Sequence, residues 1–90
     1  MVKREKLEII RDILSIIEDN KNMIKITPLL RKSNLSSLRF KEYYKDLLEG
    51  QLVKEIIDKS ENKHIILTEK GFAFLEKYKT IINFIDEFDL

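Results

Sequence analysis

A polar turn with one leucine at its centre interrupts the middle of this chain. The stretch Leu29–Phe40, LLRKSNLSSLRF, passes from one apolar-rich segment through Ser33–Ser37 into a second one. Serine and asparagine side chains compete for backbone hydrogen bonds, so they favour turns and helix starts. Leu35 cannot act in that way, and we expect it to point inward and to fix the angle between two helices.

The segments on either side of this turn are predicted to be helical. Thr27 is a suitable N-cap, and the proline after it suits the first position of a short helix over Pro28–Lys32. Ser36 or Ser37 then caps a longer helix that runs to about Glu49.

The N-terminal segment Lys3–Glu18 has the periodicity of an amphipathic helix. Its apolar residues recur at intervals of three and four on one face, namely Leu7, Ile10, Ile13, Leu14 and Ile17. Ile9 and Ile16 lie to one side of that face, which makes the apolar stripe wider than a single core contact needs. After a loop over Glu18–Asn22, the short run Met23–Ile26 is predicted to be a strand.

The second half of the chain is predicted to form a hairpin followed by a helix. Gly50 is expected to end the preceding helix in the left-handed conformation. The β-branched runs QLVKEII and HIILT are separated by the turn-prone residues Asp58–Lys63. Thr68 is a suitable cap for a last helix, which extends from Glu69 to about Phe88.

This order of elements defines a fold class. A short helix and a longer helix joined by a three- or four-residue turn form a helix-turn-helix, and a following hairpin adds a wing that can pair with Met23–Ile26. We therefore predict an α+β, mainly α, winged helix-turn-helix. It forms a single domain over residues 1–90, with a core at about 3–68 and a C-terminal helix at about 69–88.

Composition narrows the class of protein. The chain has no cysteine, which excludes disulfides and thiolate metal sites, and no apolar run near the roughly 18 residues of a membrane span. Residues 21–50 carry seven basic and three acidic side chains, giving +4, whereas residues 71–90 carry two and four, giving −2. We expect a cytoplasmic, nucleoid-associated protein whose middle segment is the electropositive part.

Two motifs resemble a known family. KITPLLRKSNLSSLRFKEYYKDLLEGQLV and ILTEKGFAFLEKY are similar to archaeal winged helix-turn-helix transcriptional regulators and chromatin-type DNA-binding proteins, over roughly Lys25–Tyr78. In that family an NLS turn precedes the recognition helix, and an LTEKG step leads from the wing into the last helix. The resemblance implies DNA binding and dimerisation through an antiparallel C-terminal coiled coil, often longer than the C-terminal helix here.

The last helix carries more apolar surface than one side of a small domain covers. Its apolar residues span about half of the circumference, against the ~100° stripe of an ordinary surface helix. The proposed seam has alternating spacings of four and three residues: Phe74, Tyr78, Ile81, Ile85 and Phe88. We expect a homodimer that uses this seam together with Ile9 and Ile16. The alternative is a helix folded back over its own domain.

The third helix is predicted to carry the DNA contacts. With Phe40 at the centre of its buried face, the outward residues are Leu38, Arg39, Glu42 and Lys45, with Lys41 at the edge. Further contacts are expected from Ser36 and Ser37 at the helix start, from Arg31 and Lys32 in the helix before it, and from Lys59, Asn62 and Lys63 in the wing. The alternatives are a solvated helix face and a plain hairpin loop.

No residues form a catalytic constellation, and no cofactor or metal site is expected. The single histidine, His64, has no second ligand nearby and is read as a structural strand residue. The predicted function is double-stranded DNA binding by a transcriptional regulator or chromatin-associated protein. The alternative is a winged-helix protein-interaction module, in which Leu38 and the mixed charges of the third helix bind a protein.

Overall fold

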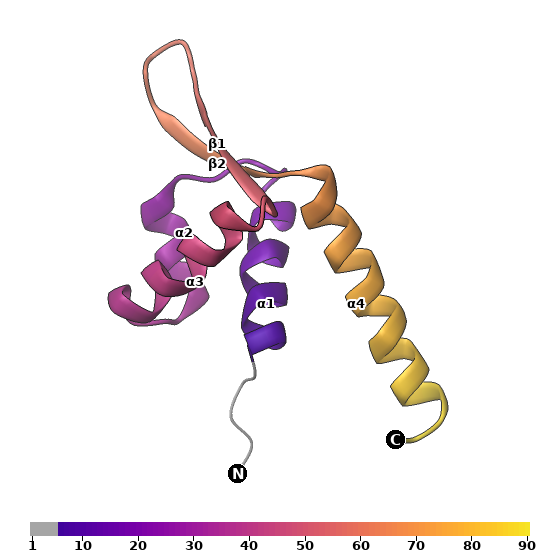
Figure 1. Cartoon of the computed structure of the whole chain (residues 1–90). Coiled ribbons are helices and arrows are strands. Elements are labelled where there is room, and N and C mark those ends of the chain that lie inside the picture. The colour runs from indigo at the N-terminus through magenta and orange to yellow at the C-terminus, as the bar shows by residue number, and fades with distance from the viewer. Residues whose placement is uncertain (1–5) are drawn as a thin grey trace.

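In a computed structural model, which describes residues 6–90, the chain folds into four helices and a two-stranded antiparallel sheet (Figure 1). The elements in chain order are α1 (Lys6–Asp19), α2 (Ile26–Ser33), α3 (Ser37–Glu49), β1 (Val53–Ile57), β2 (Lys63–Leu67) and α4 (Glu69–Glu87). This order confirms the predicted mainly helical winged helix-turn-helix. The predicted start of the first helix, at residues 3–5, lies outside the described residues.

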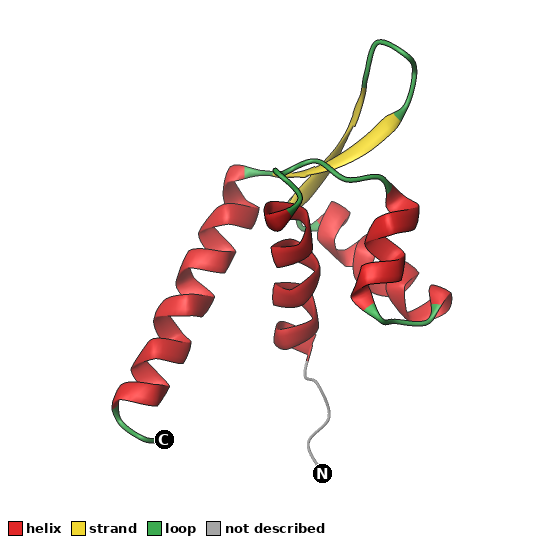
Figure 2. Ribbon diagram, turned by 180° about the vertical axis from the view of Figure 1, so that it is seen from behind, coloured by secondary structure: helices red, strands yellow, loops and turns green. Residues whose placement is uncertain are grey.

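Helix α1 lies at the centre of the fold. It packs against α2, β2 and α4, and Ile13, Leu14 and Ile17 are completely buried. Figure 2 shows α1 between α4 on one side and the α2–α3 pair on the other. Leu29 of α2 and Leu47 of α3 complete the core from the helix-turn-helix side.

The wide apolar stripe of α1 is explained within a single chain. Ile9 is 1% exposed and Ile16 is half-buried against the core, whereas Leu7, predicted on the buried face, is 56% exposed. The prediction that Ile9 lies at an interface between copies is therefore wrong. That prediction assumed that the domain covers only one side of α1, whereas α2, β2 and α4 all pack against this helix.

The predicted strand Met23–Ile26 is reduced to a single bridge. Ile24 exchanges both backbone hydrogen bonds with Ile65 of β2, at N···O distances of 3.1 and 2.7 Å. Helix α2 already begins at Ile26, with Lys25 as its N-cap, so Thr27 is not the cap. Pro28 still lies in the first turn, where its missing N–H costs no intrahelical hydrogen bond.

The C-terminus of α3 differs from its predicted form by one residue. Gly50 is the C-cap with right-handed dihedral angles, and Gln51 adopts the left-handed conformation with φ 61°. The Leu52 N–H donates to the Leu47 carbonyl at 2.9 Å, and the Gln51 N–H donates to the Leu48 carbonyl at 3.1 Å. These two bonds form a Schellman motif.

The wing is a regular antiparallel hairpin. Val53 pairs with Leu67 and Ile57 with Lys63, which leaves a five-residue loop over 58–62 instead of the six residues expected. Strand β1 begins two residues later than predicted, because Gln51 and Leu52 belong to the end of α3. Val53 and Leu67 are buried, so the base of the hairpin is anchored in the core.

Helix α4 packs on the domain only through its first half. Thr68 caps it as predicted, accepting from the Gly71 N–H at 3.1 Å and donating to the Gln51 carbonyl at 2.6 Å. Phe74 and Leu75 pack against the core. Beyond them the helix runs beside α1 and then leaves the body of the domain (Figures 1 and 2), and the molecule measures 50 × 28 × 21 Å.

Gly71 marks a close approach of α4 to the backbone. A Cβ at this position would overlap the Leu52 carbonyl oxygen. We expect Gly71→Ala to lower the free energy of unfolding by about 1–3 kcal/mol, the range for overpacking, although alanine is the better helix former. Chemical denaturation measures the change, with Lys77→Ala on the exposed side of α4 as the control. A stabilised Gly71→Ala protein would contradict this contact.

Candidate nucleic-acid interface

The α2–α3 turn is held by one buried hydroxyl. Ser33 is buried, and its Oγ donates to the Leu30 carbonyl at 2.7 Å and accepts from the Leu35 N–H at 3.3 Å. Asn34 takes the left-handed conformation with φ 59°, which asparagine tolerates well. Leu35 is half-buried against the core, as predicted for a residue that fixes the turn. The hydrogen bonds of Ser33 and the packing of Leu35 therefore fix the angle between α2 and α3.

The N-terminus of α3 has a defined cap. Ser36 is extended, and its Oγ accepts from the Arg39 N–H at 3.2 Å, which settles the predicted choice between Ser36 and Ser37. Ser37 is exposed as the first helical residue. Both hydroxyls lie at a helix N-terminus, where the unpaired N–H groups favour an anion.

The outward side of α3 has the predicted composition. Phe40 and Leu47 are buried, and Tyr43 and Tyr44 are half-buried beside them. The residues predicted to face outward are all exposed: Leu38, Arg39, Lys41, Glu42 and Lys45. Leu38 is 70% exposed, the most exposed apolar side chain of the helix-turn-helix.

Two neighbouring contacts shape the charge of this surface. The Arg39 guanidinium lies over the Tyr43 ring, 5.9 Å from its centroid, a cation–π arrangement that keeps the side chain along the helix. Lys45 lies 4.0 Å from the Glu49 carboxylate, and both side chains are exposed. Such a surface ion pair contributes little, so the Lys45 ammonium remains available to another anion.

The two basic residues of α2 are placed differently. Arg31 is exposed in the last turn. Lys32 directs its ammonium to the α1–α2 loop, where Nζ lies 3.4 Å from the Asn20 Oδ1. Lys32 is thus oriented towards α1, and Arg31 is the freer of the two predicted contacts to the flanking DNA backbone.

Asp58 organises the wing loop. Its Oδ1 accepts from the Ser60 and Asn62 N–H groups at 2.8 and 2.9 Å, and its Oδ2 lies 2.9 Å from His64 Nε2. His64 is therefore a structural strand residue, as predicted. The sequence predicts a turn over Asp58–Lys63, and the aspartate two residues before Ser60 is a known turn signal that identifies Asp58 as the residue organising it.

The three predicted wing contacts lie on the exposed hairpin end. Lys59 and Asn62 belong to the loop, and Lys63 begins β2. Lys63 Nζ lies 3.6 Å from the Glu55 Oε1 of the neighbouring strand. Glu55 also accepts a hydrogen bond from Tyr44 of α3, which no spacing in the sequence indicated.

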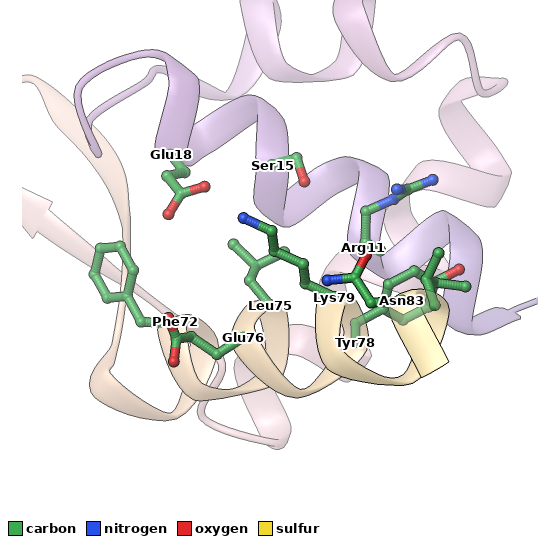
Figure 3. A pocket seen from close by; sticks show the side chains of 10 residues that line it. Arg11, Ser15, Glu18, Phe72, Leu75, Glu76, Tyr78, Lys79 and Asn83 are labelled. Atoms are coloured by element: carbon green, nitrogen blue, oxygen red, sulfur yellow. The ribbon is translucent and has the colours of Figure 1, made fainter. Parts of the chain in front are cut away.

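A second feature is a groove between α1 and α4, with a volume of about 500 Å³ (Figure 3). Arg11 of α1 lies over the Tyr78 ring of α4, 5.1 Å from its centroid. Phe72 and Leu75 of α4 contribute apolar side chains to its lining, and the Lys79 side chain extends from α4 towards α1. The groove is a shallow, mixed surface and is separate from the α3 face.

Among the described residues, no cluster of three or more acidic, histidine or cysteine side chains has the geometry of a metal site. Over the same part of the chain, every helix is too short or too polar to cross a membrane.

The fold and this surface define a winged helix-turn-helix protein. Residues 3–86 match the winged helix-turn-helix family HTH_45, and the chain belongs to that family. Among solved structures, SSV1 F-93 is similar with a TM-score of 0.67 and 28% identity, over 89% of this chain and 91% of that one. No curated protein matches the sequence.

A second solved structure shares the fold alone. It is a transcriptional regulator of the MarR family from Silicibacter pomeroyi, with a TM-score of 0.63 and 19% identity. The match covers 81% of this chain but only 48% of the regulator. The shared part therefore corresponds to about half of the larger protein.

The Asp58 contacts predict a pH-dependent wing. Hydrogen bonds from His64, Asn62 and Ser60 lower the pKa of Asp58 from 3.8 to about 2. Because the folded-state pKa is the lower one, this stabilisation is complete above pH 3.8 and is lost as the pH falls towards 2. We expect the protection of the loop amides, measured relative to their intrinsic exchange rates, to fall over this range in the wild type. Asp58→Ala should show low protection at every pH, and a variant that keeps the wild-type loss of protection would contradict the assignment.

Proposed function

We propose that this protein is a DNA-binding transcriptional regulator or chromatin-associated protein, and that α3 enters the major groove. The observation that carries the proposal is the exposed outward side of α3, which follows a self-contained turn and a capped N-terminus. A helix about 10–12 Å across matches a major groove about 12 Å wide. Membership of a winged helix-turn-helix family supports the same reading.

Each exposed group of α3 has a chemical role in this proposal. Arg39 suits a bidentate contact with guanine, and Glu42 can accept from the amino group of cytosine. Leu38 suits a thymine methyl group. Lys41 and Lys45 neutralise phosphates, which supplies most of the affinity and makes it dependent on salt. Ser36 keeps its hydroxyl proton for a phosphate, since its oxygen acts only as an acceptor in the cap.

The flanking groups extend the contact along the duplex. Ser37 lies at the α3 N-terminus, and Arg31 lies in the last turn of α2. In the wing, Lys59, Asn62 and Lys63 would follow the phosphate backbone or the adjacent minor groove. A protein bound in this way would be found on the nucleoid.

Removal of two side chains tests the DNA proposal. We expect Arg39→Ala to cost about 1–3 kcal/mol of binding free energy, and Lys45→Ala to reduce the salt slope by about one, because the first loses a base contact and the second a phosphate contact. Gel-shift titrations on mixed duplexes at two salt concentrations measure both. Lys77→Ala, which removes a cation far from α3, is the matched control.

A failure to bind DNA through α3 would favour the alternative function, which is binding of a protein partner. If the wild type binds no duplex, or both α3 variants bind like the wild type, the proposed DNA face is wrong. The specific observation that would then matter is the 70% exposure of Leu38. A winged-helix module that binds a protein through Leu38 is the second candidate function.

We also propose that two copies associate through α4. The support is the row of large apolar side chains that the distal half of α4 exposes: Ile81, Ile82, Phe84 and Phe88. Phe84 and Phe88 contact each other, with ring centroids 4.9 Å apart, and remain 55% and 58% exposed. Of the seam residues, Phe74, Tyr78 and Ile85 are half-buried and would lie at its edge or turn towards α1.

Charge limits how a second copy can lie on this surface. The distal end of α4 is acidic, with Asp86, Glu87 and Asp89, so two parallel copies would bring like charges together. An antiparallel pair keeps the two acidic ends apart and still covers the exposed apolar side chains. This arrangement agrees with the dimers that the sequence resemblance implies.

Charged substitutions in the seam test the association. Ile81→Glu with Ile85→Glu should yield a monomer of about half the native mass by light scattering, because burying two unpaired charges is costly. DNA affinity should fall although every α3 residue remains, since paired sites gain from effective concentration. Thr80→Glu with Asn83→Glu adds the same charge to the polar side of α4 and serves as the control. A wild type that is monomeric at micromolar concentration would refute the dimer.

A further inference from the structure

One chain of polar contacts joins the recognition helix to both strands of the wing. The Tyr44 hydroxyl donates to Glu55 Oε2 at 2.6 Å, and Glu55 Oε1 lies 3.6 Å from Lys63 Nζ. Tyr44 belongs to α3, Glu55 to β1 and Lys63 to β2. The two oxygens of one carboxylate thus contact two different elements.

The positions in the hairpin explain why these side chains meet. Glu55 is directly opposite Ile65, so Lys63 is its diagonal neighbour two residues along β2. Diagonal neighbours share one face of an antiparallel pair and lie within reach of long side chains. On α3, Tyr44 is half-buried on the side away from the outward residues, and its hydroxyl reaches β1.

Packing of the Tyr44 ring fixes the position of the hydroxyl that contacts Glu55. It stacks on Phe40 with ring centroids 5.7 Å apart and an interplanar angle of 10°, and Phe40 is part of the core. Burial, followed by the hydrogen bond to Glu55, raises the pKa of Tyr44 above its ordinary value. The hydroxyl therefore keeps its proton at neutral pH and always acts as the donor.

We propose that Tyr44 and Glu55 are positioning residues, which fix Lys63 and the wing relative to α3 so that both contact DNA as one unit. This inference rests on the proposed DNA-binding function. The hairpin is anchored in the core by Val53 on β1 and by Ile65 and Leu67 on β2. The Tyr44–Glu55–Lys63 chain attaches β1 to α3 at Glu55, two residues beyond Val53, which is the single buried residue of that strand. The Lys63 ammonium remains exposed and, with three donors, can contact a phosphate while it stays near Glu55.

The first test needs no DNA. Tyr44→Phe keeps the stacked ring and removes only the hydroxyl. We expect faster hydrogen exchange of the β1 and β2 amides beyond Glu55, with exchange in α1 unchanged. Tyr43→Phe is the matched control, because the Tyr43 hydroxyl has no partner among the described residues while its ring still lies under Arg39. Equal exchange in the two variants would overturn the attachment itself.

The second test asks whether the attachment matters on DNA. Tyr44→Phe should weaken duplex binding by about fivefold, the size of one ordinary hydrogen bond, and should reduce protection in the wing segment of a footprint while the α3 segment persists. Combined with Lys63→Gln, it should add less than the sum of the two single effects, because both act through one chain. Combined with Lys59→Gln at the loop, the effects should add.

The outcomes separate this inference from the proposed function. Additive effects with Lys63→Gln, or an unchanged wing footprint in Tyr44→Phe, would overturn the positioning role while DNA binding stands. A wild type that binds no duplex would overturn the DNA function and the positioning role together. In that case, faster hydrogen exchange of the wing amides in Tyr44→Phe would show that the Tyr44–Glu55–Lys63 contacts stabilise the hairpin and have no role in DNA binding.

Discussion

The apolar surface of α1 is the constraint on which the other elements depend. Ile13, Leu14 and Ile17 are completely buried, and α2, β2 and α4 all pack against the helix that carries them. Each buried aliphatic side chain contributes about 1.5–3 kcal/mol, so no comparable stabilisation is available to a hairpin or a short helix alone. The helix-turn-helix, the wing and α4 are therefore oriented relative to one another mainly because each is packed on the same helix.

Much of this fold is predictable from local patterns, and the errors lie where tertiary contacts override them. The turn around Leu35 and the caps at Ser36 and Thr68 follow from local chemistry and are present. Ile9 was misassigned because the periodicity of one helix does not show how many neighbours surround it. The strand around Ile24 is limited to one bridge because α2 begins two residues later, at Ile26, with Lys25 as its N-cap.

The candidate site is predictable in composition but not in its connections. Once Phe40 is placed inward, helical geometry alone makes Arg39 and Lys45 exposed, and they are. The Tyr44–Glu55 hydrogen bond joins residues eleven positions apart on different elements. Its geometry depends on the angle at which α3 meets the hairpin, and this angle follows from packing. No pattern in the sequence specifies that angle, so the contact between α3 and the wing could be identified only from the structure.

The division of charge along the chain has a physical consequence for how such a protein would bind. A net charge of +1 gives almost no long-range attraction to DNA, so the +4 of residues 21–50 must act locally. At physiological salt the Debye length is about 8 Å, which is shorter than the distance from α3 to the end of a molecule 50 Å long. The acidic end of α4 therefore does not cancel the field at α3, but it disfavours any pose that brings α4 to the phosphates. Under the proposed function, charge placed in this way would select the orientation of docking on DNA, and the contacts of α3 and the wing would then determine its strength.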